Sequence, residues 1–150
     1  MFKYFISALL LANACAAHAV PFESHQTSPT AKIHYDEAKK SLDANKWKPA
    51  LSSLQKAVEL EPNNADIHNL LGYSYRKQGN LDKAFEHYGI SLRLNPGHVG
   101  AHEYIGETYL LVKDLPNAEK HLAALESLCS KSCEQYRDLS KAIGEYKSKQ

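Results

Sequence analysis

Two cysteines near the end of the chain have the spacing that points most directly to chemistry. Cys129 and Cys133 stand four residues apart in the stretch CSKSC. On one helical turn their Cα atoms would lie about 6 Å apart, near the upper end of disulfide geometry, and a bend between them would ease the bridge. We therefore predict a structural disulfide. A redox-active dithiol and reduced or metal-bound thiols stay open as alternatives, although catalytic dithiols usually have cysteines two residues apart.

Histidines recur at two positions of a 34-residue period, and we call each set of equivalent histidines a column. His34, His68 and His102 follow one another at intervals of 34 residues, and so do His87 and His121. Ligands of one metal ion lie about 2 Å from it, whereas equivalent residues of neighbouring helix pairs are separated by at least one helix spacing of about 8–10 Å. A column therefore cannot form a shared metal site. We expect packed, half-buried imidazoles, no metal ligand and no cofactor.

Patterns typical of enzymes are missing from the sequence. It has no nucleophile elbow, no phosphate-binding glycine loop and no His-Glu-x-x-His motif. The 150 residues carry 18 Lys and Arg against 17 Asp and Glu, which argues against a nucleic-acid partner. We predict one globular domain without catalytic residues.

The first 19 residues resemble a cleavable export signal. In MFKYFISALLLANACAAHA, the single Lys3 precedes an apolar run that is about half the roughly 20 residues needed to span a membrane. We expect no stable membrane span, cleavage after Ala19, and a periplasmic or secreted protein. Lipid attachment at Cys15 is the alternative, but Ala12 stands where bacterial lipoprotein signals usually have Leu. Loss of Lys3 would leave equal numbers of acidic and basic residues.

Residues 20–30 join this signal to the remainder of the chain. The segment contains two prolines and several small polar residues, and its lack of periodicity predicts a flexible lead-in. Ser28 and Pro29 at its end are typical of a helix start, with the serine side chain accepting a free N–H.

A period of 34 residues organises the next part, in blocks 31–64, 65–98 and 99–132. Each block has small residues where two antiparallel helices would cross, a bulky residue beside them and, in the first two blocks, a closing proline. These residues are Ala38, Gly72 and Gly106; Ala50, Ala84 and Ala118; Leu54, Tyr88 and Leu122; and Pro62 and Pro96. The turn between the helices favours a residue that tolerates positive φ, which suits Asn45 and Gly79 but not Lys113.

These positions strongly resemble the tetratricopeptide repeat (TPR) family. The resemblance covers residues 31–132 and implies an all-α fold, an α-solenoid of three helix–turn–helix repeats. Residues 133–150 follow as a capping helix and tail. The helix places Tyr136, Leu139, Ile143 and Tyr146 on one face, as expected of a cap over the last repeat.

The family resemblance also implies where a partner would bind. The first helix of each repeat lines a concave groove in this family, with the basic residues here in repeats one and two and the acidic residues in repeat three. The predicted partner-binding residues are Tyr35, Lys39, Asn69, Tyr73, Arg76, Glu103, Glu107 and Leu110. Chaperone-binding members grip a carboxylate with basic residues and Asn, but here the corresponding positions hold Tyr35, Leu70, Gly100 and Tyr104, and only Lys39 is suitable.

We therefore predict a monomeric, non-enzymatic scaffold that binds a protein or peptide partner in an exported compartment. One alternative is a metal- or redox-handling periplasmic protein that uses Cys129, Cys133 and histidines. Another is an accessory subunit of an enzyme that assembles the cell envelope. The sequence does not identify the partner.

Overall fold

The computed structural model describes residues 28–150, and the regular structure in this part of the chain is helical. The helices are α1 (Pro29–Asp43), α2 (Trp47–Leu60), α3 (Ala65–Lys77), α4 (Leu81–Leu94), α5 (Val99–Leu111), α6 (Leu115–Cys129) and α7 (Glu134–Lys147). The predicted leader of residues 1–19, its cleavage site after Ala19 and the alternative lipid site at Cys15 lie outside the described residues, as do residues 20–27.

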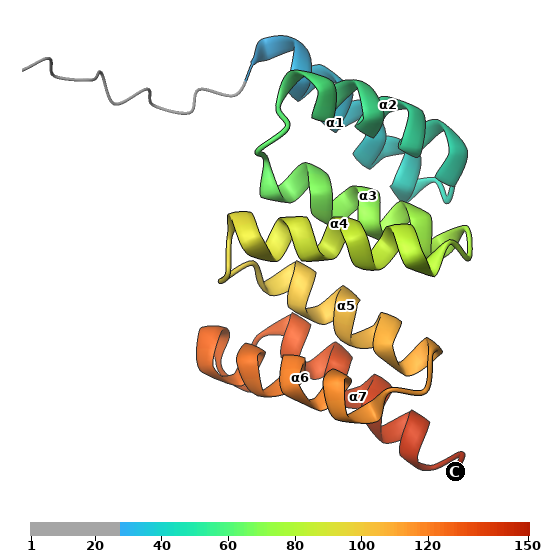
Figure 1. Ribbon diagram of the computed structural model, residues 1–150, viewed down its shortest axis with the longest axis vertical. Helices are drawn as coiled ribbons and strands as arrows, with labels where there is room; N and C mark the ends of the chain where they lie inside the picture. Colours follow the sequence, from blue (N-terminus) through green and yellow to red (C-terminus); the bar gives the residue numbers. More distant parts are fainter. Residues whose placement is uncertain (1–27) are drawn as a thin grey trace, which may run out of the picture.

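Consecutive helices pair as hairpins, α1 with α2, α3 with α4 and α5 with α6. The hairpins stack along the long axis of the molecule, and α7 packs against α5 and α6 at the end of the stack (Figure 1). The predicted all-α fold of three TPR repeats plus a capping helix is confirmed.

Small residues let these helices approach one another closely. The alanines at the predicted crossing positions are fully buried: Ala38, Ala50, Ala84 and Ala118. A Cβ atom on Gly72 would lie 2.6 Å from the ring of Tyr88 on α4, so glycine leaves the room that this buried tyrosine occupies. A Cβ atom on Gly106 would lie 2.6 Å from Leu139 of α7. Gly106, which is equivalent to Ala38 and Gly72 in the first two repeats, therefore makes room for the capping helix. The repeat pattern did not predict this contact.

Three turns between paired helices share one backbone conformation. Asn45, Gly79 and Lys113 have φ angles of 55°, 78° and 63°. The predicted turn position is therefore the same in all three repeats, and Lys113 adopts positive φ although its side chain disfavours it. The left-handed conformation costs a residue other than glycine roughly 1–2 kcal/mol, so this turn is strained.

The helix starts are fixed by side chains that accept backbone N–H groups. Asn64, Asn80, His98 and Asp114 cap α3, α4, α5 and α6 in this way. The prediction for Ser28 is half right, because α1 begins at Pro29 but the serine side chain makes no capping bond. Its backbone N–H donates instead to the carboxylate of Glu61. The predicted flexible segment of residues 20–30 thus overlaps the first turn of α1.

The capping helix completes the core at the end of the stack. Leu139 and Ile143 of α7 are buried in one cluster with Ala118 and Leu125 of α6. Tyr136 packs against the same cluster. The apolar face predicted for residues 133–147 therefore covers the last hairpin.

Candidate functional site

The predicted partner-binding residues lie on the first helix of each hairpin, and we call the surface that carries them the α1/α3/α5 face. Tyr35 and Lys39 lie on α1, Asn69, Tyr73 and Arg76 on α3, and Glu103, Glu107 and Leu110 on α5. Their accessibility differs. Lys39 is exposed and Tyr35 and Tyr73 are half-buried, whereas Asn69 and Glu103 are buried.

An ion pair connects α3 and α5 across this face. Nη1 of Arg76 lies 2.6 Å from Oε2 of Glu107, with side-chain exposures of 11% and 25%. The Arg76 guanidinium also lies over the rings of Tyr73 and Tyr104, at 5.4 and 5.5 Å from their centroids. One basic residue of repeat two and one acidic residue of repeat three therefore neutralise each other, which reduces the predicted charge difference between the two ends of the face.

Two of the predicted polar contacts belong to the interior. Asn69 is 6% exposed, and its Oδ1 atom has no hydrogen-bond partner within the described part of the chain. Glu103 is 8% exposed; burial raises the pKa of its carboxyl to about 8, and the carboxylates of Glu107 and Asp138 add to the shift. Leu110 packs against the core cluster under α7. These residues shape the α1/α3/α5 face from beneath more than they present groups on it.

Aromatic rings of α2, α3 and α5 contact one another at this face. Tyr73 contacts Trp47 edge-on, with centroids 6.0 Å apart, and its centroid lies 4.9 Å from that of Tyr104. The exposed Lys77 places its amine 5.7 Å from the Trp47 ring centroid and 5.3 Å from that of Tyr73. We refer to Trp47, Tyr73 and Tyr104 as the aromatic strip.

Trp47 and Tyr104 are functional candidates that the sequence did not assign. Trp47 is the only tryptophan of the chain and is the first residue of α2. The sequence did not indicate it because the predicted contact residues were taken from the first helix of each repeat. Tyr104 follows the predicted position Glu103 by one residue. A large aromatic beside a predicted contact position was the signal that would have pointed to it.

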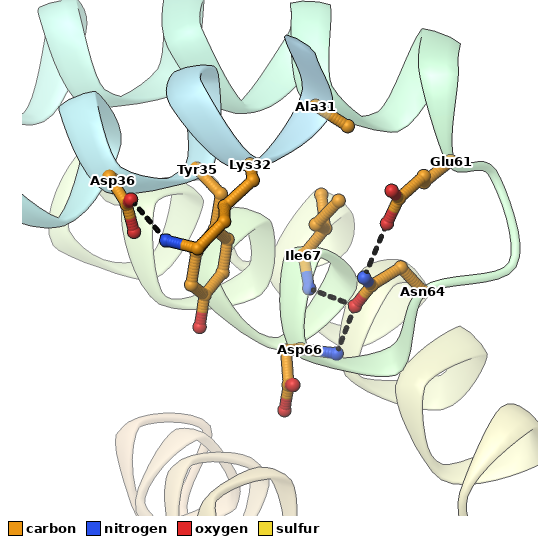
Figure 2. Close-up of a pocket in the computed structure, with 8 residues that line it drawn as sticks. All are labelled: Ala31, Lys32, Tyr35, Asp36, Glu61, Asn64, Asp66 and Ile67. Atoms are coloured by element: carbon orange, nitrogen blue, oxygen red, sulfur yellow. Dashed lines mark hydrogen bonds and ion pairs between the residues drawn. The ribbon is translucent and has the colours of Figure 1, made fainter. Parts of the chain in front are cut away.

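A small pocket lies at one end of the α1/α3/α5 face, between α1 and the start of α3 (Figure 2). Its volume is about 200 Å³. The residues lining it are Ala31, Lys32, Tyr35, Asp36, Glu61, Asn64, Asp66 and Ile67. Burial raises the pKa of the Tyr35 hydroxyl, and the carboxylates of Asp66 and Asp36 add to the effect.

Histidines from the two columns meet inside hairpins two and three. Nδ1 of His68 lies 3.0 Å from Nδ1 of His87, and Nδ1 of His102 lies 2.8 Å from Nδ1 of His121. His87 stacks on Tyr75, and His121 stacks in the same way on Tyr109. The expectation of packed imidazoles is met, but the columns pair with each other, a relationship missed when each column was considered alone.

Bonds to backbone carbonyls place one proton on His68 and one on His102. Nε2 of His68 lies 2.9 Å from the carbonyl oxygen of Pro62, and a carbonyl only accepts, so Nε2 must carry the proton. If His68 carries no second proton, its Nδ1 accepts and Nδ1–H of His87 donates to it. His102 binds the carbonyl oxygen of Pro96 at 3.0 Å in the same way. Burial and the adjacent His102 lower the pKa of His121 to about 4.

The two cysteines join the last repeat to the cap. Cys129 ends α6, Cys133 precedes α7, and their Sγ atoms lie 2.08 Å apart, the separation of a disulfide. Among residues 28–150, no group of three or more His, Cys, Asp or Glu side chains is arranged to hold a metal ion. Within the same range, no helix is long and apolar enough to cross a membrane.

Family models and relatives agree with this architecture. A model of the TPR repeat matches residues 41–79, and a model of the tetratricopeptide repeat matches residues 65–98. An uncharacterized protein of Haemophilus influenzae is 27% identical over 108 residues, covering 72% of this chain and 59% of its own length. The tetratricopeptide repeat domain-containing protein PYG7, chloroplastic, of Arabidopsis thaliana is 33% identical over 78 residues, or 49% of this chain and 26% of PYG7.

A transferase also contains a related segment. The Protein O-mannosyl-transferase TMTC4 of Mus musculus is 46% identical over 48 residues, which are 32% of this chain and 6% of that protein. The chain thus spans less than two thirds of each of these relatives.

Solved structures share the fold at low sequence identity. The first TPR of Spaghetti (RPAP3), bound to the HSP90 peptide SRMEEVD, gives a TM-score of 0.72 at 18% identity, covering 82% of this chain and 99% of that one. The TPR2B domain of yeast Sti1, in a complex with pHsp70, gives 0.73 at 16% identity, covering 82% and 100%. Both likenesses concern the arrangement of the helices.

Proposed function

Because the chain is a tetratricopeptide repeat protein, we propose that it is a non-enzymatic module that binds a peptide or protein partner on its α1/α3/α5 face. The observation that carries this proposal is the aromatic strip of Trp47, Tyr73 and Tyr104 with Lys77 beside it. Partly exposed aromatic rings on packed helices offer a large contact area with little side-chain entropy to lose on binding.

The partner differs in this proposal from the peptides bound by similar structures. The Spaghetti structure is a complex with an HSP90 peptide, and the Sti1 structure is a complex with pHsp70. Tyr35, Leu70 and Gly100 stand here where the resemblance predicts residues that grip a carboxylate, and Asn69 and Glu103 are buried. We therefore expect aromatic and aliphatic contacts with an extended segment, and less dependence on a terminal carboxylate.

The compartment is a second part of the proposal. The leader pattern of residues 1–19 supports export, with a monomer in the periplasm or outside the cell, and the close Cys129–Cys133 pair suits an oxidising space. Mass spectrometry of the protein from the native cell should find a chain that begins at residue 20. Alkylation without reductant should label neither cysteine. An intact leader or two labelled cysteines would contradict export.

Site-specific crosslinking tests the binding face directly. A photoreactive amino acid is placed in the full chain at position 39 on α1, and in a matched variant at position 56 on α2, where the native lysine is also exposed. After irradiation in the cell, we expect a discrete crosslinked protein from position 39 and none from position 56. Equal adducts from both positions, or adducts from position 56 alone, would place the partner elsewhere.

A further inference from the structure

The pocket between α1 and α3 continues the α1/α3/α5 face, and what it admits bears on which partner fits. Tyr35 is one of the predicted contact residues and forms part of its lining. Its volume of about 200 Å³ is below the 300–1,000 Å³ of typical small-molecule sites. A space of this size suits one side chain of a larger partner.

The lining carries more negative than positive charge. Three carboxylates, those of Asp36, Glu61 and Asp66, and one amine, that of Lys32, belong to the lining. The amine lies 2.6 Å from Oδ2 of Asp36 (Figure 2). Glu61 is engaged on both oxygens, since Oε2 accepts from Nδ2 of Asn64 at 2.7 Å and Oε1 accepts from the backbone of Ser28. Asp66 is the carboxylate that keeps most of its surface, with a side chain 68% exposed.

A histidine contacts Asp66 without cancelling its charge. Nε2 of His98 lies 3.0 Å from Oδ1 of Asp66, while Nδ1 of the same ring accepts the backbone N–H of Ala101. His98 is therefore the neutral tautomer with its proton on Nε2, and it donates to one oxygen of Asp66. The charge of Asp66 and its second oxygen stay available to a ligand.

The ring of Tyr35 is the part of the lining that suits an aliphatic stem. It is half-buried and forms a wall of the pocket, whereas Ala31 and Ile67 beneath it are 0% and 1% exposed and support the lining from within. Long basic side chains bury their methylene groups on apolar surfaces while the charged end stays near water. An aromatic wall adds attraction for a cation that lies over its face.

We propose that this pocket receives a lysine or arginine side chain of the bound partner, with Asp66 accepting a hydrogen bond from its charged end and the half-buried ring of Tyr35 packing on its stem. This rests on the proposed function, since the side chain belongs to the segment bound on the α1/α3/α5 face. The pocket thus selects partners with a basic residue at one end of that segment.

Titration with a charged and an uncharged form of one side chain tests the proposal. Nα-acetyl-arginine amide and Nα-acetyl-citrulline amide have nearly the same shape, but only the first carries a charge. Each is added to the full chain, and nuclear magnetic resonance follows Tyr35 and Ile67. We expect saturable chemical-shift changes with the arginine probe. The dissociation constant of the citrulline probe should be up to about fivefold higher, the difference that one exposed charge pair makes.

A pair of variants separates the pocket from general charge effects. Asp66→Asn should weaken arginine binding about fivefold. Asp82→Asn should not, although Asp82 occupies the same first-turn position on α4. Equal binding of both probes, or an unchanged affinity in Asp66→Asn, would overturn the proposal. Crosslinking from position 39 distinguishes the two failures, because adducts there would support the binding face even if the pocket does not select arginine.

Discussion

Nδ1 of His102 lies 2.8 Å from Nδ1 of His121, so a hydrogen bond between two imidazoles closes the third hairpin from inside. The same bond, at 3.0 Å, joins His68 and His87 in the second hairpin. A pair of this kind holds a single bridging proton. If both rings are charged, two N–H groups face each other and the bond is lost.

Stability should therefore fall in mild acid. An unfolded histidine has a pKa of about 6.5, whereas the pKa of His121 in the fold is about 4 because of burial and His102. Between these values the unfolded chain binds more protons, so the stabilisation present above pH 6.5 is lost as the pH falls towards 4. The burial of His121 is partial, so we expect this group to account for a loss on the order of 1–2 kcal/mol.

The comparison of two variants isolates this effect in urea titrations at pH 7.5 and 4.5. His121→Phe keeps a ring beside Tyr109 but cannot titrate, so its stability should depend less on pH than that of the native chain. His34→Phe is the control, because Ser53 stands in repeat one at the position of His87 and His121. An undiminished pH dependence in His121→Phe would show that the pairs do not sense protons.

Glu103 should affect stability in the opposite direction. Its carboxyl keeps a proton in the fold up to a pKa of about 8, because of burial, but loses it near 4.5 in the unfolded chain. The folded state binds more protons in that window, so rising pH costs stability. Glu103→Gln should stabilise the protein at pH 9, on the order of 1–2 kcal/mol, and have little effect at pH 4.

Glu107→Gln is the matched variant one helical turn further along α5. It weakens the ion pair with Arg76 and should destabilise the protein, since Arg76 is only 11% exposed. Thermal unfolding at pH 9 would show the two opposite effects. A destabilised Glu103→Gln protein would mean that the native carboxylate is satisfied in its ionised form.

The repeat architecture could be predicted because it depends on a few side-chain sizes at fixed intervals. Gly72 and Ala84 recur with their equivalents, and each is small because a helix or a large ring lies against it. The turn at Lys113 also follows from the period, since its backbone matches that of Gly79 despite the unsuitable side chain.

The repeat pattern alone does not predict contacts between residues at different repeat positions. His68 and His87 lie on the two helices of one hairpin, at the same height along it, so their contact follows only when both positions are considered together. Arg76 and Glu107 come from different repeats, and their contact depends on how far α5 is displaced along α3. The burial of Asn69 and Glu103 has the same origin, because family positions alone do not specify how closely neighbouring helices approach.

Gly72 should not tolerate even one added methyl group. In Gly72→Ala the new Cβ would lie 2.6 Å from the ring of the fully buried Tyr88, so the ring or the helices must shift. We expect a loss of about 2 kcal/mol, typical of overpacking. Gly144→Ala is the control, since a Cβ there meets no atom of residues 28–150 within 4 Å apart from its chain neighbours and the backbone of its own helix. It should stabilise α7 by about 0.5–1 kcal/mol. Equal effects in urea unfolding would contradict the close packing.

Lys113 offers a simple route to a more stable protein. Lys113→Gly removes the steric cost of a φ angle of 63° and should add about 1 kcal/mol to the free energy of unfolding. Asn45→Gly, at the equivalent turn with φ of 55°, should gain less because asparagine adopts this conformation more readily. A lower midpoint of urea unfolding for Lys113→Gly would show that the lysine side chain has a stabilising role.

The affinity of selected peptides tests the central claim, binding on the α1/α3/α5 face, most directly. Peptides are selected from a random library on the full chain, and their dissociation constants are measured for Lys39→Glu, Lys77→Glu and, as a control on α2, Lys56→Glu. All three lysines are exposed, so the substitutions should not disturb folding. We predict at least tenfold weaker binding by the variants on α1 and α3 and unchanged binding by the α2 variant. Peptides that respond to Lys56→Glu but not to the other two would contradict the account.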